Sequence, residues 1–333
     1  MSLPLSALDL VPVSQGVTNG EAVQHSLALA RELDRLGYRR LWYAEHHNMP
    51  AIASTTPATM IALAAQQTQS IRVGSGGVML PNHAPLQVAE TFKMLESIYP
   101  GRIDLGIGRA PGTDQVTALA LRRSRERMLA DDFPEQLDEL MDFGSGLTRS
   151  HPFVGVTAYP EDVPLPPIWL LGSSDFSAAL AAKLGLGFAF AAHFSPDRPD
   201  VAMLGYRDAF EPSDSLEQPH AILAISVICA ETEAEAERLA SCMQLSWVRL
   251  RSGRPSKIPT PEEALGYRYN EQELIAARAY RQLQIIGTPN AVRQRIEALA
   301  ARTKADEVMV TTVTHDYSAR IRSYQLLAAA FSG

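Results

Sequence analysis

The amino-acid sequence predicts an α/β protein in which residues 1–333 form one (β/α)8 barrel domain with loop insertions. Short apolar runs rich in β-branched residues alternate with longer segments of helical period, and about eight such pairs follow one another without a long linker. Repeated strand–helix units imply a parallel sheet, and eight units fit a closed barrel. A doubly wound sheet in two domains is the competing fold, but the sequence contains no boundary at which two such domains would separate.

Each predicted strand is a short apolar run bounded by glycine, proline or polar residues. The predicted strands span 5–12, 39–44, 71–80, 103–108, 167–171, 188–191, 221–229 and 306–312. The run at 71–80 contains several glycines, which are unfavourable inside a strand and indicate a bulge or a close approach of another group. The segment 144–167 is rich in proline and glycine, and we expect it to be a loop.

The predicted helices are longer segments in which apolar residues recur at helical spacing. They span 20–36, 57–68, 85–99, 125–143, 176–184, 201–210, 233–249, a segment that ends at 283 and a last segment that ends at 331. In the first helix Leu29 and Leu33 lie one turn apart, and Gly37 ends it. Thr56 and Pro57 suit the N-cap and the first turn of the second helix.

Composition excludes several classes of protein. The net charge is −7 and lysine and arginine form no basic stripe, so nucleic acid is not an expected partner. There is no apolar run of membrane-spanning length, and the N-terminus lacks the pattern of a signal peptide. Cys229 and Cys242 are the only cysteines and cannot form a disulfide framework, so we expect a cytoplasmic location.

The candidate functional residues follow the predicted strands, at the end of a (β/α)8 barrel where active sites lie. They are Glu45, His46 and His47 after the second strand, Gly76 and Gly77 in the third, Gly108 and Arg109 after the fourth, Ser173, Ser174 and Ser177 after the fifth, and His193 after the sixth. The loops that precede the strands carry no comparable residues. One face of the barrel is therefore predicted to carry the chemistry.

Glu45, His46 and His47 stand next to one another, and three interpretations are open. Neighbours on an extended segment point in opposite directions, so at most one histidine faces the barrel axis. A metal site is disfavoured because the HExxH spacing is absent, and we predict no metal. A histidine that caps the strand end remains possible. We favour acid–base chemistry, because a neutral imidazole beside a carboxylate can hold or pass a proton near pH 7.

Arg109 and the three serines are candidates for binding one phosphate group. The sequence around Gly108 is not a dinucleotide fingerprint, because Pro111 occupies the position of its third glycine. Arg109 is a candidate anion clamp, and Ser173, Ser174 and Ser177 open a helix whose N-terminus suits a phosphate. Ordinary N-capping by serine is the alternative explanation. An arginine and one such helix suit a phosphomonoester, as in a mononucleotide like FMN.

A second phosphate site is conceivable, since barrels of this class frequently bind phosphate after the last two strands. The sequence there is Gly287-Thr288-Pro289. Thr288 as an N-cap with Pro289 in the first turn explains it without a ligand. We therefore prefer the site at Arg109 and the serines.

Three segments, LWYAEHHNMP, IRVGSGGVMLPNHAPLQVAE and GRIDLGIGRAPGTD, resemble the luciferase-like family of flavin-dependent monooxygenases. The resemblance covers the whole chain and is strongest over residues 5–125. It implies a (β/α)8 barrel that binds FMN, in its reduced form during turnover. It also implies a reaction with O2 through a C4a-peroxyflavin, a small organic substrate, a separate NAD(P)H:flavin reductase and a homodimer built on the early helices.

The same resemblance assigns roles to individual residues. The histidine beside the flavin falls on His46, with Glu45 or a backbone carbonyl fixing its tautomer and His193 as a second candidate near the ring. A non-proline cis peptide beneath the ring falls on Gly76–Gly77, the phosphate-binding arginine on Arg109, and the remaining phosphate contacts on Ser173, Ser174 and Ser177.

Departures from the family pattern limit these expectations. Bacterial luciferase has larger residues at Gly76, Gly77 and Gly108 and a glutamate at Ser173, so we do not expect light emission. An F420-dependent or NAD(P)H-linked oxidoreductase of the same fold, and a non-catalytic flavin-binding protein, are the alternatives. The substrate is not identified by the sequence, and we expect the loops 114–125 and 251–269 to cover it.

Overall fold

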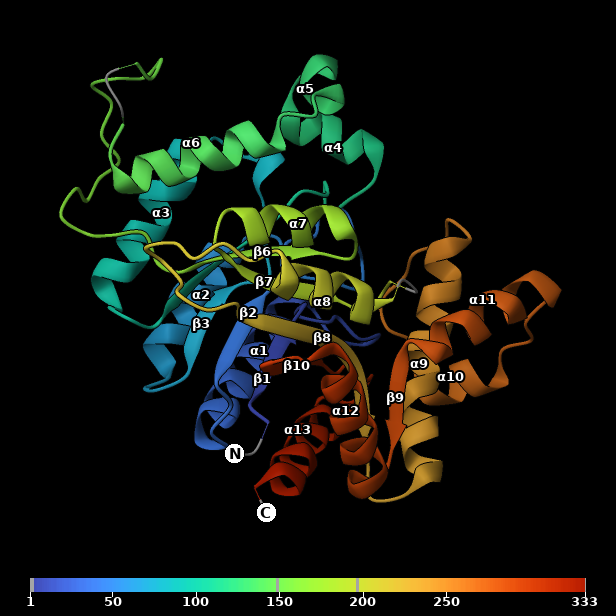
Figure 1. Ribbon diagram of the computed structural model, residues 1–333. Coiled ribbons are helices and arrows are strands. Elements are labelled where there is room, and N and C mark those ends of the chain that lie inside the picture. The colour runs from blue at the N-terminus through green and yellow to red at the C-terminus, as the bar shows by residue number, and fades with distance from the viewer. Residues whose placement is uncertain (1–2, 148–149, 196–197, 333) are drawn as a thin grey trace.

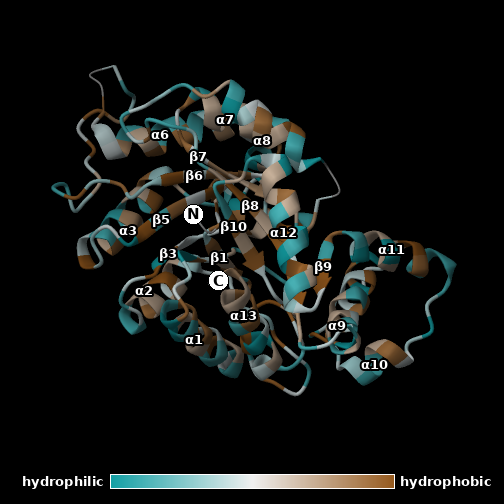
Figure 2. Cartoon of the chain, turned by 60° about the horizontal axis from the view of Figure 1, so that its bottom comes forward, coloured by the Kyte–Doolittle hydropathy of each residue, from teal (hydrophilic) through white to brown (hydrophobic). Residues whose placement is uncertain are grey.

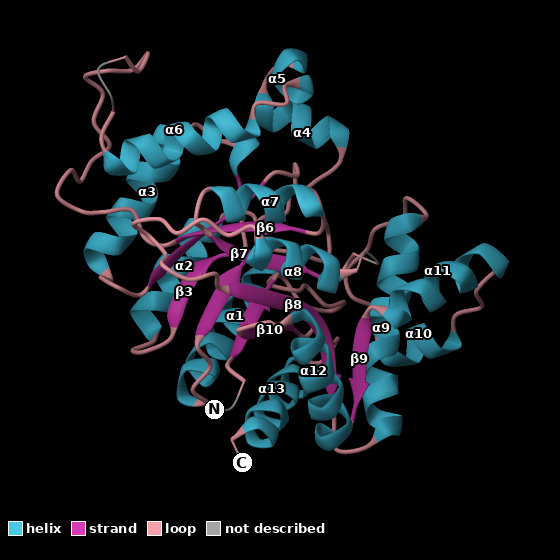
Figure 3. Ribbon diagram, viewed as in Figure 1, coloured by secondary structure: helices cyan, strands magenta, loops and turns pink. Residues whose placement is uncertain are grey.

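The computed structural model describes residues 3–147, 150–195 and 198–332, and parallel strands form a closed barrel at its centre (Figure 3). The barrel strands follow the order β10, β1, β2, β3, β5, β6, β7, β8, and β8 pairs with β10 to close the ring. Their bounds are β1 Leu5–Asp9, β2 Arg40–Tyr43, β3 Arg72–Ser75, β5 Ile103–Gly108, β6 Ile168–Gly172, β7 Gly187–Ala191, β8 Ala221–Cys229 and β10 Glu307–Thr311. The predicted barrel is confirmed.

Helices surround the barrel and cover its outer face (Figure 1). Those packed around it are α1 Asn19–Arg35, α2 Pro57–Gln67, α3 Pro85–Ile98, α6 Phe133–Ser145, α7 Asp175–Lys183, α8 Pro199–Asp208, α12 Pro289–Thr303 and α13 Tyr317–Phe331. In α1 a capping box joins Thr18 and Glu21, and Leu29 and Leu33 are buried against the barrel. In Figure 2 the strands are largely hydrophobic, whereas the helices carry hydrophilic residues on their outer sides.

A buried charged network fills the N-terminal end of the barrel. Arg40 donates from Nε to Glu307 Oε1 and from Nη1 to Asp104 Oδ2, each at 2.8 Å. Its guanidinium also lies 4.7 Å from the centre of the Trp169 ring, and Trp42 donates to Asp104. Because these charges are paired and bonded, they can be buried without a large penalty. The open end of the barrel is consequently the opposite one, where the strands finish.

One large insertion interrupts the strand–helix alternation between β8 and α12. It contains α9 Glu233–Arg251, α10 Pro261–Gly266, α11 Glu271–Gln282 and β9 Gln284–Gly287. The strand β9 pairs with Ser226–Cys229, the second half of β8, and so lies outside the closed ring. In Figures 1 and 2 the three helices stand to one side of the barrel.

Several predicted elements differ from those observed. The third strand breaks at Gly76–Gly77 and resumes as β4 Val78–Met79, followed by the 3-10 turn η1 Leu80–Asn82. The predicted helix 125–143 is divided into α5 Arg125–Leu129 and α6, because Pro134 sits in the first turn of a new helix.

Four further elements were not predicted. The helix α4 Gln115–Arg122 and the helix α10 lie in segments expected to be loops, and both are short, which weakens their periodic signal. The strand β9 and the helix α12 were missed as well, although the capping signal of Thr288 and Pro289 had been recognised. Among the described residues, no helix is long and apolar enough to cross a membrane.

Candidate functional site

A cavity of about 1040 Å3, its open mouth included, lies at the C-terminal ends of the strands, and we call it the flavin-type cavity after the cofactor that the family resemblance implies. Most of the residues singled out in the sequence line it, namely His46, Gly76, Gly108, Arg109, Ser173, Ser174, Ser177 and His193. Its remaining walls are mainly apolar and include Leu8, Leu10, Trp42, Met79 and Leu171. A mainly apolar cleft with a few convergent polar groups is the usual form of a cofactor or substrate site.

His46 lies at the end of β2, where its ring is held by a backbone carbonyl. Its Nδ1 lies 3.2 Å from the oxygen of Gly112, and a carbonyl can only accept, so Nδ1 carries a proton. The second nitrogen, Nε2, then has a free lone pair. Burial lowers the pKa of His46, although the Gly112 carbonyl and the charge of Glu45 act in the opposite direction. The ring is therefore a neutral proton acceptor at pH 7.

Gly112 makes this contact possible. Its φ is +67°, and a Cβ at this position would lie 2.7 Å from the backbone oxygen of Glu45, so a side chain cannot be accommodated. The same carbonyl accepts the backbone N–H of His47 at 3.2 Å. The loops after β2 and β5 are thus joined at one atom.

His193 approaches the flavin-type cavity from the end of β7. Burial lowers the pKa of His193 to about 4 although contact with the backbone of Ala224 acts in the opposite direction, and the nearby ring of His46 adds to the lowering, so this imidazole is also neutral at pH 7. Its Nδ1 is buried and has no hydrogen-bond partner among the described residues. An unpaired buried nitrogen is costly unless a ligand or water satisfies it. Two neutral imidazoles therefore border one cavity.

Glu45 is not among the residues that line this cavity. Its carboxylate is fully buried and accepts hydrogen bonds from His47 Nε2 at 3.0 Å, from His83 Nε2 at 2.9 Å and from the backbone N–H of Met79 at 2.9 Å. Burial would raise the pKa of Glu45, but the bonds from the two histidines and Met79 lower it overall. Glu45 is thus an ionised group that ties the end of β2 to β4. The tautomer of His46 is set by the carbonyl, not by Glu45.

The glycines at the third strand serve close packing. The peptide bond Gly76–Gly77 is cis, as predicted. A Cβ at Gly77 would lie 2.7 Å from the backbone oxygen of Gly106, and a Cβ at Gly76 would lie 2.7 Å from Leu8. A Cβ at Gly108 would meet only the flexible end of Met79, which itself lines the cavity. The absence of a side chain at Gly77 is therefore required by the neighbouring strand, not by space for a ligand.

Arg109 and the start of α7 form a binding place for an anion at one end of the cavity. The guanidinium of Arg109 lies 4.3 Å from the centre of the Phe176 ring, and it forms no ion pair with another described residue. Ser174 is the N-cap of α7, yet its side chain makes no capping bond with the described backbone. The first N–H groups of α7 are thus free to bind an anion.

The alternative phosphate site near the last strands is already satisfied by protein groups. The carboxylate of Glu233 accepts the backbone N–H of Thr288 at 3.1 Å and lies against Gly287. An internal carboxylate at the N-terminus of α12 leaves an incoming phosphate facing a like charge. This arrangement agrees with the preference for the site at Arg109.

Sequence reasoning missed several residues of the site. His83 was given no role from the sequence, and its partner Glu45 is 38 positions away. Two aromatic residues also gave no signal beyond ordinary hydrophobicity. Phe176 lies beneath Arg109, and Phe194 makes an edge contact with His193, with ring centres 4.8 Å apart. Among the described residues there is no group of three His, Cys, Asp or Glu side chains that could hold a metal ion.

Comparison with known proteins places this geometry in context. A family model described as luciferase-like monooxygenase matches residues 5–307. A luciferase-like monooxygenase of Escherichia coli K12 is 42% identical over 325 residues, which covers 98% of this chain and 96% of that protein. The crystal structure of apo-MsnO8 superposes with a TM-score of 0.88 at 38% identity and covers 99% of this chain and 98% of its own.

A more distant structure shares the fold alone. It is the oxygenating constituent of 3,6-diketocamphane monooxygenase from Pseudomonas putida, a type II Baeyer–Villiger monooxygenase in complex with FMN. The TM-score is 0.70 at 19% identity, and the match covers 99% of this chain and 98% of that chain.

Proposed function

This chain belongs to the luciferase-like monooxygenase family, and from that premise we propose that it is an FMN-dependent, two-component monooxygenase. It would receive reduced FMN from a separate NAD(P)H:flavin reductase and use O2 to oxygenate a small organic molecule. One observation carries the proposal. Arg109 and the open N-terminus of α7 lie at the same cavity as two neutral imidazoles, His46 and His193.

The residues present fit the phosphate of FMN. The guanidinium of Arg109 supplies charge and a planar set of donors, and Phe176 stacks beneath it. Ser173 and Ser174 offer hydroxyl groups beside the first N–H groups of α7. Ser177 lies one turn further along α7, with its hydroxyl against Gly172, and lines the same cavity.

The apolar walls fit a flat ring system. Trp42, Met79 and Leu171 border the cavity, and the backbone of Gly76 forms part of its floor. When bound, reduced flavin supplies the electrons that activate O2, and the protein orients it and keeps out water. An apolar enclosure suits that task because it contains few groups that hold water.

His46 would hold or move the proton. Its Nδ1 is bonded to Gly112, so Nε2 is the atom that accepts a proton or a hydrogen bond. His193 would act beside it, since its unsatisfied Nδ1 borders the same cavity. Glu45 would be a positioning residue, because it holds the loop of His46 against β4 without bordering the cavity.

A visible absorption spectrum of the purified protein, followed by oxygen uptake on addition of FMNH2, tests the proposal. Saturable FMN binding together with FMNH2-dependent oxygen uptake supports it. Preferential binding of F420, or hydride transfer without oxygen uptake, would replace it with the oxidoreductase alternative. FMN binding without consumption of FMNH2 or O2 beyond that of free flavin would indicate a non-catalytic flavin-binding protein.

A further inference from the structure

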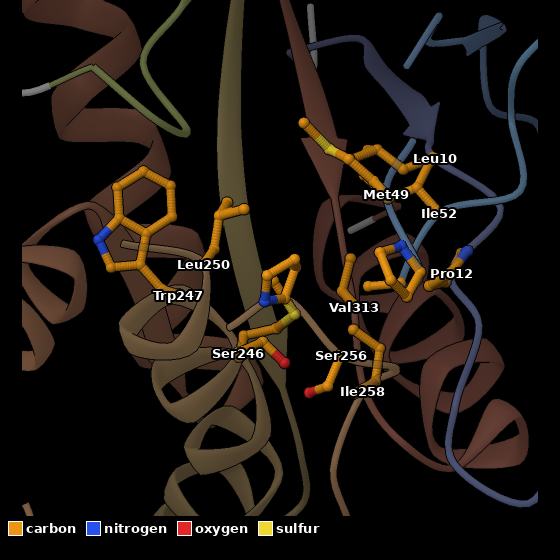
Figure 4. A pocket seen from close by; sticks show the side chains of 14 residues that line it. Leu10, Pro12, Met49, Ile52, Ser246, Trp247, Leu250, Ser256, Ile258 and Val313 are labelled. Carbon is orange, nitrogen blue, oxygen red and sulfur yellow. The ribbon is translucent and has the colours of Figure 1, made fainter. Parts of the chain in front are cut away.

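A second cavity of about 560 Å3 lies beside the flavin-type cavity, and we call it the apolar cavity. One wall comes from the ends of the barrel strands, with Leu10 and Pro12 after β1, Met49 to Ile52 after β2 and Val313 after β10. The other wall comes from the insertion. It consists of Met243, Ser246, Trp247 and Leu250 on α9 and Pro255, Ser256 and Ile258 after it. Figure 4 shows the side chains of the two walls facing one another.

The lining is almost entirely apolar. Among the described residues that border the cavity no side chain is charged, and the only side-chain hydroxyls are those of Ser246 and Ser256. Ser256 already donates to the carbonyl of Lys257. Ser246 Oγ is buried and has no hydrogen-bond partner in the described part of the chain. The cavity therefore offers one unsatisfied hydroxyl in an apolar surround.

The indole that borders the cavity has a fixed position. Trp247 stacks on Tyr280 of α11, with ring centres 4.9 Å apart and an angle of 18° between the planes. Its neighbour one turn away on α9 is Leu250, which is about half exposed at the rim. A rigid aromatic wall lets a ligand bind without ordering that side chain first.

Leu10 borders both cavities, and its side chain lies between them. The next residue, Val11, has a φ of +52°, which is a rare conformation for a β-branched residue. Its N–H donates to Asp9 Oδ1 at 2.7 Å, and the same oxygen accepts Arg320 at 2.8 Å. Ser26 donates to the other oxygen of Asp9 at 2.6 Å. A buried network thus holds a strained backbone that fixes Leu10.

We propose that the apolar cavity binds the organic substrate and that the substrate is an uncharged, predominantly apolar molecule with one hydrogen-bonding group. This inference rests on the proposed function. The hydrogen-bonding group pairs with Ser246 Oγ, and the apolar body lies between Trp247 and Ile52. The group to be oxygenated extends past Leu10 into the flavin-type cavity.

The charge of the substrate follows from the lining. Burying an ionised carboxylate without a partner is far more costly than burying a hydroxyl, and the described residues of this cavity provide no cation to pair with it. An apolar chain, by contrast, gains free energy with each methylene group removed from water. The cavity therefore discriminates between an alcohol and the carboxylate of the same chain length.

The test compares 1-octanol with octanoate at pH 7, by calorimetry and by the fluorescence of Trp247 on the purified full-length protein. We expect saturable binding of 1-octanol, and octanoate binding weaker by roughly tenfold or more. Leu250→Lys should abolish 1-octanol binding, whereas Leu265→Lys, on α10 and exposed outside the cavity, should not. Ser246→Ala should weaken 1-octanol binding by up to about tenfold. Trp247→Phe should remove the change in fluorescence on binding of 1-octanol but keep the heat of binding.

Three outcomes would overturn the inference. Equal affinity for 1-octanol and octanoate would refute the substrate class. Binding of 1-octanol that survives both Leu250→Lys and Ser246→Ala would locate it elsewhere. Competition between 1-octanol and FMN would mean that the two ligands share one cavity. A failure of the proposed function is distinguishable, because it would appear as absent FMN binding while 1-octanol binds normally.

Discussion

The Nδ1 atom of His46 lies 3.2 Å from the carbonyl oxygen of Gly112, which joins the end of β2 to the loop after β5. That contact assigns the proton to Nδ1 and leaves Nε2 as the acceptor. Replacing the side chain at position 46 should therefore affect proton transfer more than the binding of FMN.

His46→Ala should bind FMN nearly as well as the wild type but form product at least about a hundredfold more slowly, because general acid–base help is typically worth 10²–10⁴-fold. Peroxide released per FMNH2 oxidised should rise. Stopped-flow mixing with oxygenated buffer and a peroxide assay measure both. His47→Ala is the matched control, since His47 bonds to Glu45 and does not border the cavity. An unchanged ratio of product to peroxide in His46→Ala would mean that His46 has only a structural role.

Acidification should reproduce part of the same defect. Burial lowers the pKa of His46 below its ordinary value of 6.5, so the ring is neutral above that pH and becomes protonated only at lower pH. The ratio of product to peroxide should be constant from neutral to alkaline pH and should fall as the pH drops below 6.5. A ratio that fell on the alkaline side would contradict this assignment.

Arg109→Ala should weaken FMN binding by roughly tenfold or more, because a charge-assisted bond to phosphate contributes about 1.5–3 kcal/mol. Fluorescence titration of oxidised FMN measures the dissociation constant. Arg278→Ala removes an exposed arginine of α11 and should change nothing. Riboflavin, which lacks the phosphate, should bind wild type and Arg109→Ala equally. An unchanged dissociation constant for FMN would remove Arg109 from the site.

Gly77→Ala should affect stability, whereas Gly108→Ala should affect FMN binding. A Cβ at Gly77 meets the backbone of Gly106 at 2.7 Å, so the barrel must shift, and we expect a loss of stability of about 1–3 kcal/mol. A Cβ at Gly108 meets only the flexible Met79 side chain at the cavity, so this variant should fold normally and bind FMN more weakly. Urea denaturation and FMN titration of each variant measure the two effects, and equal stability of both variants would refute the packing explanation.

Low pH should destabilise the barrel through Glu307. Burial would raise the pKa of Glu307, but the neighbouring His220, Arg40 and Ser6 lower it to about 2. A depressed pKa contributes stability that is complete above the unfolded value near 4.5 and is lost as the pH falls toward 2. The difference corresponds to about 3 kcal/mol. Urea denaturation between pH 6 and pH 3 follows the first part of this loss, and Glu307→Gln should flatten the dependence over that range.

Met94 and Ile98 of α3 are more than half exposed, and we predict that this surface forms a homodimer. Light scattering should give a particle of twice 36.3 kDa. Met94→Glu combined with Ile98→Glu should produce the monomer, because two buried charges would face the partner. Ile275→Glu on α11, which is equally exposed, is the control. A 36.3 kDa wild-type particle at every concentration would contradict the prediction.

The sequence was most informative where its signal is local. The strand 103–108 and the strand 221–229 were predicted with the observed bounds, since both are uninterrupted apolar runs between turn residues. His46, Arg109 and the serines could be found because they follow strands. The partnership of Glu45 with His83 could not, because it depends on how the segments that follow β2 and β4 meet in space.

Non-local packing also explains the other misses. The cis peptide at Gly76–Gly77 was predicted, but the contact that excludes a side chain at Gly77, with the backbone of Gly106, lies on another strand. The strand β9 is only four residues long and is recognisable only through its pairing with β8. The apolar cavity is built from segments as far apart in the sequence as Leu10 and Val313. No periodicity within one segment reports such contacts.

The insertion between β8 and α12 has an evolutionary consequence. Met243, Trp247 and Leu250 all belong to one helix of the insertion, whereas His46 and Arg109 belong to barrel loops. Substitutions along that helix can reshape one cavity while the other keeps its contacts. Selection can therefore diversify the molecules that such a protein accepts while the residues that carry out the reaction stay the same.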